Sequence, residues 1–280
     1  MIDAHVHFWK YNKIKDAWIT DEMQLLQRDF LPTDLQPTLP ENNIDGVIAV
    51  QADQSENETE FLLALAKRYA IIKGIVGWVD LQNKDLENKL LYYSKYHVIK
   101  GFRHLVQAEP TGFLKGEKFL NGIKLLENFG FTYDILIYEN QLKEAVDFVN
   151  KFPTQKFIID HCAKPAISDK SISDPIAIGW KSAMKEIGQN KNVYCKVSGL
   201  ITEAKWNEWN EKDLYPYLDV VFEAFGTGRI LFGSDWPVML LSGNYLRWKD
   251  LLQQYMNQFS AEEKEKVFAQ NAIDFYNVLL

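Results

Sequence analysis

The sequence predicts a (β/α)8 barrel that forms a single domain over residues 1–280. Its length suits this fold, since 280 residues can hold eight strand-helix units. Segments of buried-strand character alternate with amphipathic segments along the whole chain, without a break in composition. The alternative, an open parallel sheet, would need a glycine-rich nucleotide-binding turn after the first strand, where His5-Val6-His7 stands instead.

The first nine residues are expected to form the opening strand. Asp3, His5 and His7 alternate there with apolar residues. Alternate side chains of a strand lie on one face. His5 and His7 are therefore expected to point the same way, close enough to hold one ion or to polarise one substrate.

The following segment, residues 11–40, is irregular and rich in aromatic, acidic and proline residues. It is too long for a simple connection between two elements. We therefore expect a long loop over the mouth of the barrel.

The rest of the chain alternates regularly. Runs of β-branched and apolar residues indicate strands, and apolar residues spaced three and four apart indicate helices. The further strands are expected at 44–52, 71–81, 98–106, 131–138, 156–162, 193–199 and 230–235. The helices are expected at 56–69, 83–95, 117–129, 141–152, 174–188 and 214–225, and two more close the chain, the last one introduced by the capping-box pattern Ser260-Ala-Glu-Glu263.

Charge and composition narrow the function classes. The net charge of −7 disfavours binding to nucleic acids and to anionic membranes. No apolar stretch is long enough for a membrane-spanning helix, and the amino terminus lacks the pattern of a signal peptide. The two cysteines, Cys162 and Cys195, are too few for a disulfide framework. Both are expected to be buried and to pack as small hydrophobic side chains. A cytoplasmic protein is expected, with a homo-oligomer left open.

Side chains able to act in catalysis fall at the predicted strand ends. In a barrel of this kind the carboxyl ends of all strands meet at one mouth, where active sites lie. His5 and His7 end the first strand, while the fourth, sixth and eighth end in Arg103-His104, Asp160-His161 and Asp235. Taken singly, each of these side chains could have a purely structural role and form a hydrogen bond to a neighbouring loop. Together they predict acid-base or metal-ligand groups converging on one cavity.

These strand ends resemble the amidohydrolase superfamily and, within it, the branch of sugar lactonases that act on L-fuconolactone and L-rhamnonolactone. The resemblance spans the whole chain. It rests on the motifs Asp3-Ala-His5-Val-His7, Lys100-Gly-Phe-Arg103-His104, Asp160-His161-Cys-Ala-Lys164-Pro165 and Gly233-Ser234-Asp235-Trp236-Pro237. It implies a (β/α)8 hydrolase acting on carboxylic ester bonds, a lactonase.

The resemblance also implies one divalent metal, most often zinc, with His5, His7 and Asp235 as its ligands. The fifth predicted strand has no histidine and the fourth has no lysine at its end, so a second metal is not expected. In some lactonases of this branch the metal is dispensable, and the same is left open here.

Hydrolysis of a ring ester requires a base for water, stabilisation of an oxyanion and a proton for the leaving oxygen. Asp235 is the expected general base, and His161 is expected to help polarise the carbonyl group. Arg103 or His104 would stabilise the oxyanion. These two residues face opposite sides of their strand, and the sequence leaves open which one enters the cavity.

A neutral polyhydroxy lactone is the expected substrate. A dicarboxylate would favour several arginines, and only Arg103 falls at a catalytic strand end. Tryptophans near the strand ends can offer flat walls to a sugar ring, and amide and amine groups can bond its hydroxyls. The candidates for contact with the substrate are Trp18, Gln51, Trp78, Lys164 and Trp236.

Two other functions remain open from the sequence. One is a metal-dependent decarboxylase of an aromatic or unsaturated acid, which would share the first and last motifs. The other is a barrel that binds a sugar without catalysis. Substitution of Asp235 separates the second from a hydrolase, because binding alone does not need a base.

Overall fold

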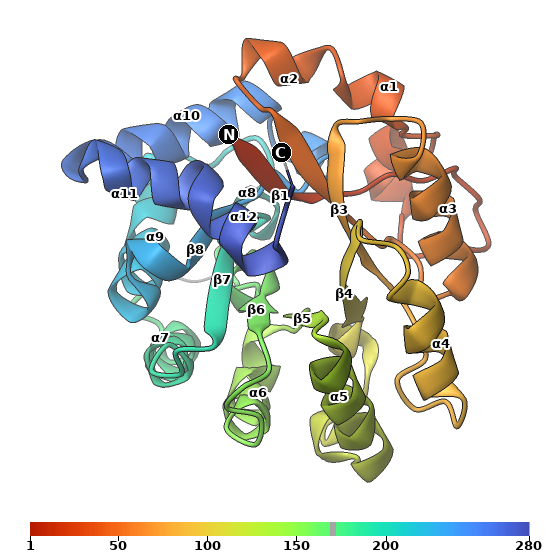
Figure 1. Cartoon of the computed structure of the whole chain (residues 1–280). Coiled ribbons are helices and arrows are strands. Elements are labelled where there is room, and N and C mark those ends of the chain that lie inside the picture. Colours follow the sequence, from red (N-terminus) through yellow and green to blue (C-terminus); the bar gives the residue numbers. More distant parts are fainter. Residues whose placement is uncertain (169–171, 280) are drawn as a thin grey trace.

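The computed structural model describes residues 1–168 and 172–279. Eight parallel strands form one sheet in chain order, with helices around it (Figure 1). The strands are β1 (Ile2–Val6), β2 (Gly46–Val50), β3 (Ile72–Gly77), β4 (Ile99–His104), β5 (Thr132–Ile135), β6 (Phe157–Ile159), β7 (Val193–Val197) and β8 (Ile230–Phe232). The predicted (β/α)8 barrel is confirmed.

The helices follow the strands in the expected alternation. Those of the described residues are α1 (Pro32–Leu35), α2 (Thr38–Glu41), α3 (Glu56–Ala66), α4 (Leu86–Tyr93), α5 (Glu117–Phe129), α6 (Leu142–Val149), α7 (Pro175–Ile187), α8 (Leu200–Glu203), α9 (Glu211–Phe225), α10 (Tyr245–Tyr255), α11 (Ala261–Glu265) and α12 (Asn271–Tyr276). None of them is long and apolar enough to cross a membrane.

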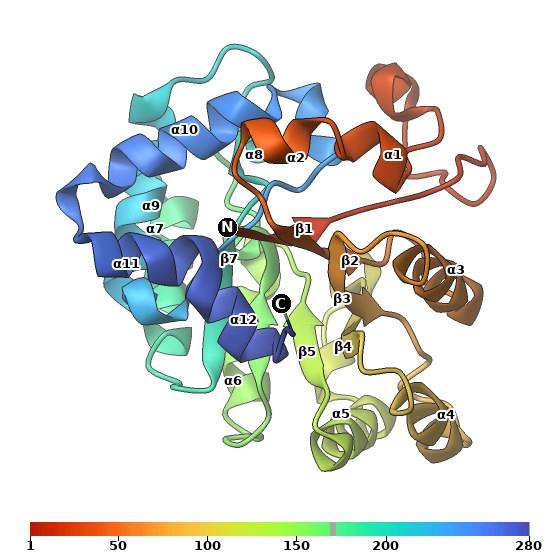
Figure 2. The ribbon, with the colours of Figure 1, turned by 45° about the horizontal axis from the view of Figure 1, so that its top comes forward.

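The barrel closes where β8 meets β1. The backbone N–H of Asp235 donates to the carbonyl of His5 at 2.9 Å, and the N–H of His7 donates to the carbonyl of Trp236 at 2.7 Å. Figure 2 shows the helices arranged around the strands, with the amino terminus and β1 near the middle. The seam between the first and last strands therefore consists of predicted site residues.

Strand β1 does not alternate as simply as its sequence suggests. Its pairing with β2 shifts register between Asp3 and Val6, as at a β-bulge. Asp3 accepts hydrogen bonds from the Tyr245 hydroxyl of α10 at 2.7 Å and from the N–H of Ser234 at 2.9 Å. His5 instead contacts the buried side chains of other strands inside the barrel.

The barrel interior has an apolar end and a charged end. Ile2 and Ala4 share a buried apolar cluster with Phe275 and Tyr276 of α12, which thus covers the amino-terminal end of the strands. Nearer the other end, the interior contains buried histidine, aspartate, lysine and arginine side chains. Larger apolar side chains fill the layer between strands and helices.

Some boundaries differ from the sequence prediction. Segment 11–40 is not wholly irregular, because it contains a short 3-10 helix (η1, Asp21–Leu26) together with α1 and α2. Helix α9 begins three residues earlier than expected, where the Asn210 side chain accepts from the N–H of Lys212. The predicted capping box of Ser260 and Glu263 is present at the start of α11. A π-helical turn then continues α11 into α12.

Candidate active site

A cavity of about 240 Å³ opens at the carboxyl ends of the strands. It is lined by His7, Trp18, Ala52, Arg103, Leu105, Gln107, Ala108, Leu136, His161, Lys164, Asp235 and Val238. Five of the predicted polar residues therefore meet at one cavity, together with Trp18 from the long segment after β1.

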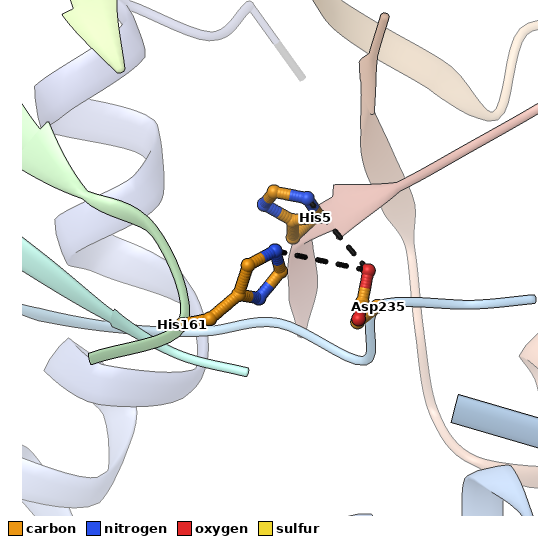
Figure 3. Close-up of side chains that lie close together, drawn as sticks. All are labelled: His5, His161 and Asp235. Carbon is orange, nitrogen blue, oxygen red and sulfur yellow. Dashed lines mark ion pairs between the residues drawn. The ribbon is translucent and has the colours of Figure 1, made fainter. Parts of the chain in front are cut away.

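Three imidazole rings surround one carboxylate oxygen at this cavity. The Oδ1 atom of Asp235 lies 3.4 Å from Nε2 of His7 and 3.9 Å from Nε2 of both His5 and His161. The Nε2 atoms of His5 and His7 are 3.1 Å apart. Figure 3 shows His5, His161 and Asp235 pointing toward one another from three separate segments.

The outer nitrogens of two of these rings have partners that orient them. Nδ1 of His7 lies 2.8 Å from the carbonyl oxygen of Val50, which can only accept a hydrogen bond. Nδ1 of His161 lies 2.9 Å from the Ser198 hydroxyl. The bond to Val50 orients the His7 ring so that its Nε2 atom faces the carboxylate of Asp235.

Burial and neighbouring groups set the ionisation of the site. Burial lowers the pKa of His161 to about 4 and that of His5 well below its usual value, so both rings are neutral at pH 7. Burial alone would raise the pKa of Asp235, but His161, His7 and His5 outweigh it and lower that pKa. The site therefore combines neutral imidazoles with an ionised carboxylate.

The backbone around His161 adopts a rare conformation. Residues 161–164 all have φ between 46° and 59°, and Asp235 has φ of 61°, values that cost a non-glycine residue of order 1–3 kcal/mol each. Gly199, with φ of 64°, lies so close that a Cβ atom there would be 2.6 Å from Nδ1 of His161. Glycine is thus required at 199 both by its backbone angle and by the imidazole beside it.

Beneath the imidazoles lies a network of buried charges. The Lys196 ammonium lies 2.5 Å from Asp134, 3.0 Å from Asp160 and 3.2 Å from Nδ1 of His5. Arg103 donates to Asp160 at 2.9 Å. Burial raises the pKa of Asp134 to about 6, whereas Lys196, His5 and Arg103 outweigh burial at Asp160 and lower its pKa. The network holds His5 and Arg103 in place with charge-assisted bonds.

The donor set fits a single divalent ion. The nearest atoms of His5, His161 and Asp235 all lie within 4.8 Å of one another, and His7 adjoins them. Two ligands of a tetrahedral zinc ion, at about 2.0–2.1 Å from it, are about 3.4 Å apart, close to the separation of the His5 and His7 Nε2 atoms. Imidazole and carboxylate are ligands that zinc accepts, and the buried partners of the outer ring nitrogens are typical of such sites.

The structure places Arg103 in the cavity and His104 outside it. Nε2 of His104 lies 2.8 Å from Glu109, and its ring stacks on Phe113 at 4.8 Å. Successive strand residues face opposite sides, so His104 belongs to the layer between strand and helices. The prediction that His104 could stabilise an oxyanion is therefore not supported.

Three predicted contacts with the substrate also lie elsewhere. Gln51 holds Arg103 in place. The backbone carbonyl of Gln51 accepts from the guanidinium at 2.5 Å, and its side-chain amide donates to the backbone carbonyl of Arg103 at 3.2 Å. The backbone of Trp78 is bonded to the Thr59 hydroxyl, and its ring does not line the cavity. Trp236 is buried in a group of aromatic rings with Phe8 and Phe30. Trp18 and Lys164 do line the cavity.

Sequence reasoning missed two buried members of the site and one residue of its wall. The two buried members are Lys196 and Asp134, which were not predicted to form a charged network beneath the imidazoles. Both interrupt apolar strands, which is a signal for a paired charge in a barrel interior. Gln107 lies in a short loop helix (η2, Val106–Ala108), where nothing in the local pattern marks it.

Comparison with known proteins agrees with this geometry. The sequence profile of the amidohydrolase family matches residues 2–278. An L-fucono-1,5-lactonase of Burkholderia multivorans is 34% identical, with 98% of this chain and 95% of that protein covered. One of Burkholderia ambifaria is 31% identical, with 99% and 95% covered. A crystal structure of an amidohydrolase from Burkholderia multivorans with bound zinc superposes with a TM-score of 0.95 at 34% identity, covering 99% of each chain. This chain belongs to the amidohydrolase family.

Proposed function

We propose that this protein hydrolyses the ring ester of a sugar lactone, an aldonolactone such as L-fuconolactone or L-rhamnonolactone. One observation carries the proposal: three imidazoles converge on the ionised carboxylate of Asp235 at a cavity of about 240 Å³. The similarity to two L-fucono-1,5-lactonases supports the same substrate class.

Asp235 is the proposed general base. Its lowered pKa keeps it ionised at neutral pH, so it can accept a proton from the attacking water and return it to the ring oxygen that leaves. A carboxylate with so low a pKa is a weak base. The attacking water must therefore be made more acidic than bulk water.

Zinc is the proposed cofactor, held by His5, His7 and Asp235 with His161 as a fourth neighbour. When bound, zinc lowers the pKa of water from 15.7 to about 7 and polarises a carbonyl oxygen. Neighbouring residues orient the imidazoles. The hydrogen bond to the Val50 carbonyl fixes the His7 ring, and the Ser198 hydroxyl fixes the His161 ring.

Arg103 is the proposed stabiliser of the oxyanion. Its two terminal nitrogens are held by Asp160 and by the carbonyl of Gln51, so the guanidinium is positioned before substrate binds. Its Nε atom has no hydrogen-bond partner among the described residues. A fixed cation beside the cavity costs no reorganisation when negative charge develops on the carbonyl oxygen.

The Asp235→Asn variant tests the proposal. With a pH-indicator assay on a panel of aldonolactones, in the presence of zinc, we expect wild-type turnover and a loss of about 10²–10⁴-fold in kcat for the variant. The asparagine cannot accept the proton from water. The matched control is Asp80→Asn, a carboxylate in the loop after β3 that does not line the cavity, and it should keep wild-type rates.

Two outcomes would contradict the proposal. Equal turnover by wild type and Asp235→Asn would exclude Asp235 as the base. If wild type opened no lactone but released carbon dioxide from a hydroxybenzoate, the protein would be a decarboxylase instead.

A further inference from the structure

One polar group in the wall of the cavity has no partner. The side chain of Gln107 lines the cavity, and its Oε1 atom is buried without a hydrogen bond to any described residue. A buried carbonyl oxygen left unpaired costs about 1–3 kcal/mol. Such an atom in the wall of a binding cavity is suited to accept a hydrogen bond from whatever enters it.

The backbone that carries this side chain is held on several sides. The N–H of Gln107 donates to the carbonyl of Leu136 at 3.1 Å, and the Gln141 amide donates to the carbonyl of Val106 at 2.9 Å. The N–H of Leu105 donates to the Gln54 side chain at 2.8 Å. The loop after β4 is therefore tied to the loops after β2 and β5. Gln107 is presented from a fixed position, although its own amide oxygen remains unbonded.

The neighbours of Gln107 in the cavity wall cannot satisfy it. Leu105, Ala108 and Leu136 contribute to the same wall, and none of these side chains can donate a hydrogen bond. Gln107 thus offers a polar group among the apolar side chains of this part of the cavity wall. Binding sites use such isolated polar groups to fix the orientation of a ligand.

We infer that Gln107 determines substrate specificity: its Oε1 atom accepts a hydrogen bond from a hydroxyl group of the lactone that takes no part in ester hydrolysis. The inference rests on the proposed lactonase function and adds one requirement to it. A substrate must place a hydroxyl donor against this wall while its ester carbonyl lies at Asp235.

The experiment pairs a variant with a change in the substrate. Gln107→Met keeps the length of the side chain and removes the acceptor. kcat/KM is measured for the aldonolactone that wild type opens fastest and for each of its monodeoxy forms. Wild type should disfavour one deoxy form by about 10- to 100-fold, the range expected for losing a bond to a buried acceptor. Gln107→Met should lose the same factor on the parent lactone and nearly nothing on that deoxy form.

Two further variants separate specificity from structure. Gln107→Glu retains an acceptor oxygen and should keep the wild-type order of lactones. Gln141→Met breaks the bond to Val106 and loosens the same loop, so it should slow all lactones by a similar factor. A uniform loss, or no loss, with Gln107→Met would overturn the role of Gln107. Failure of wild type to open any lactone would refute the proposed function itself, which is a different result.

Discussion

Gly199 shows how a residue without a side chain can determine the position of a site residue. Its φ of 64° suits glycine, and its Cα lies where any Cβ would meet the imidazole of His161. His161 itself stands at the start of four successive residues with positive φ. The position of its ring therefore depends on packing against Gly199 and on the bond to Ser198.

Gly199→Ala should damage both stability and activity. The alanine at positive φ costs about 1–2 kcal/mol, and its methyl group displaces the His161 ring, which should lower kcat/KM by about 10²-fold. Gly130→Ala is the matched control, because Gly130 has φ of 74° and open space around it. It should lose a similar stability in urea unfolding and retain its lactonase rate. Equal activity of the two variants would contradict this account of Gly199.

The sequence predicted the groups that meet at the cavity better than the groups that support them. His5, His7, His161 and Asp235 could be predicted because strand ends of a barrel share one mouth. The sequence left open which of Arg103 and His104 lies on the cavity side of β4, and the structure places Arg103 there. Contacts such as those of Gln107 depend on loops brought together from distant parts of the chain. The local pattern of apolar and polar residues therefore cannot predict them.

At the scale of elements, an ion pair joins the segment after β1 to helix α3. The Lys15 ammonium donates to Glu58 at 3.0 Å, and the other oxygen of Glu58 accepts from the N–H of Ala52 at 3.1 Å. Ala52 and Trp18 both line the cavity. The side chain of Glu58 is 1% exposed and that of Lys15 is 33% exposed. This pair therefore ties the segment that carries Trp18 to the first turn of α3.

Lys15→Met should lower stability by about 2 kcal/mol at pH 7, because it leaves a buried carboxylate without its cation. Burial already raises the pKa of Glu58, against the lowering effect of Lys15. A raised carboxyl pKa means that the native state holds its proton to higher pH than the unfolded chain, so stability falls as pH rises through that interval. Without Lys15 the pKa rises further, and the fall extends to higher pH.

Urea unfolding from pH 4 to pH 8 measures this difference. The variant and wild type should converge near pH 4, where Glu58 is protonated in both, and diverge toward pH 8. Lys13→Met, in the same exposed turn, should follow the wild-type curve throughout. A constant gap at all pH values would mean that Lys15 contributes only through packing.

The fold as a whole could be predicted because each strand-helix unit repeats the same local alternation. The alternation of strands and helices in the sequence does not reveal the register in which β1 pairs with its neighbours where the barrel closes. The shift between Asp3 and Val6 turns Asp3 toward α10 and His5 into the barrel, and it depends on pairing with β2 and β8. The short helices within residues 11–40 likewise depend on tertiary contacts, such as the pairing of Trp9 with Phe30.

Zinc should stabilise the whole molecule, because its proposed ligands come from both sides of the seam. After removal of metal with a chelator, added zinc should raise Tm with increasing concentration, by the equivalent of about 2.7 kcal/mol at 100 times its Kd. His5→Ala should abolish most of this rise. His97→Ala, an exposed histidine that follows α4, should retain it. A rise unaffected by His5→Ala would place the ion elsewhere.

The seam between β1 and β8 also bears on synthesis of the chain in the cell. Asp3 and Ser234, which it joins, are 231 positions apart. At about 5–20 residues per second, β1 leaves the ribosome roughly 10–50 s before the strand that completes its pairing. During this interval β1 has one free edge, a surface on which strands of other chains can add. Nascent chains of this protein should therefore depend on chaperones until the eighth strand emerges.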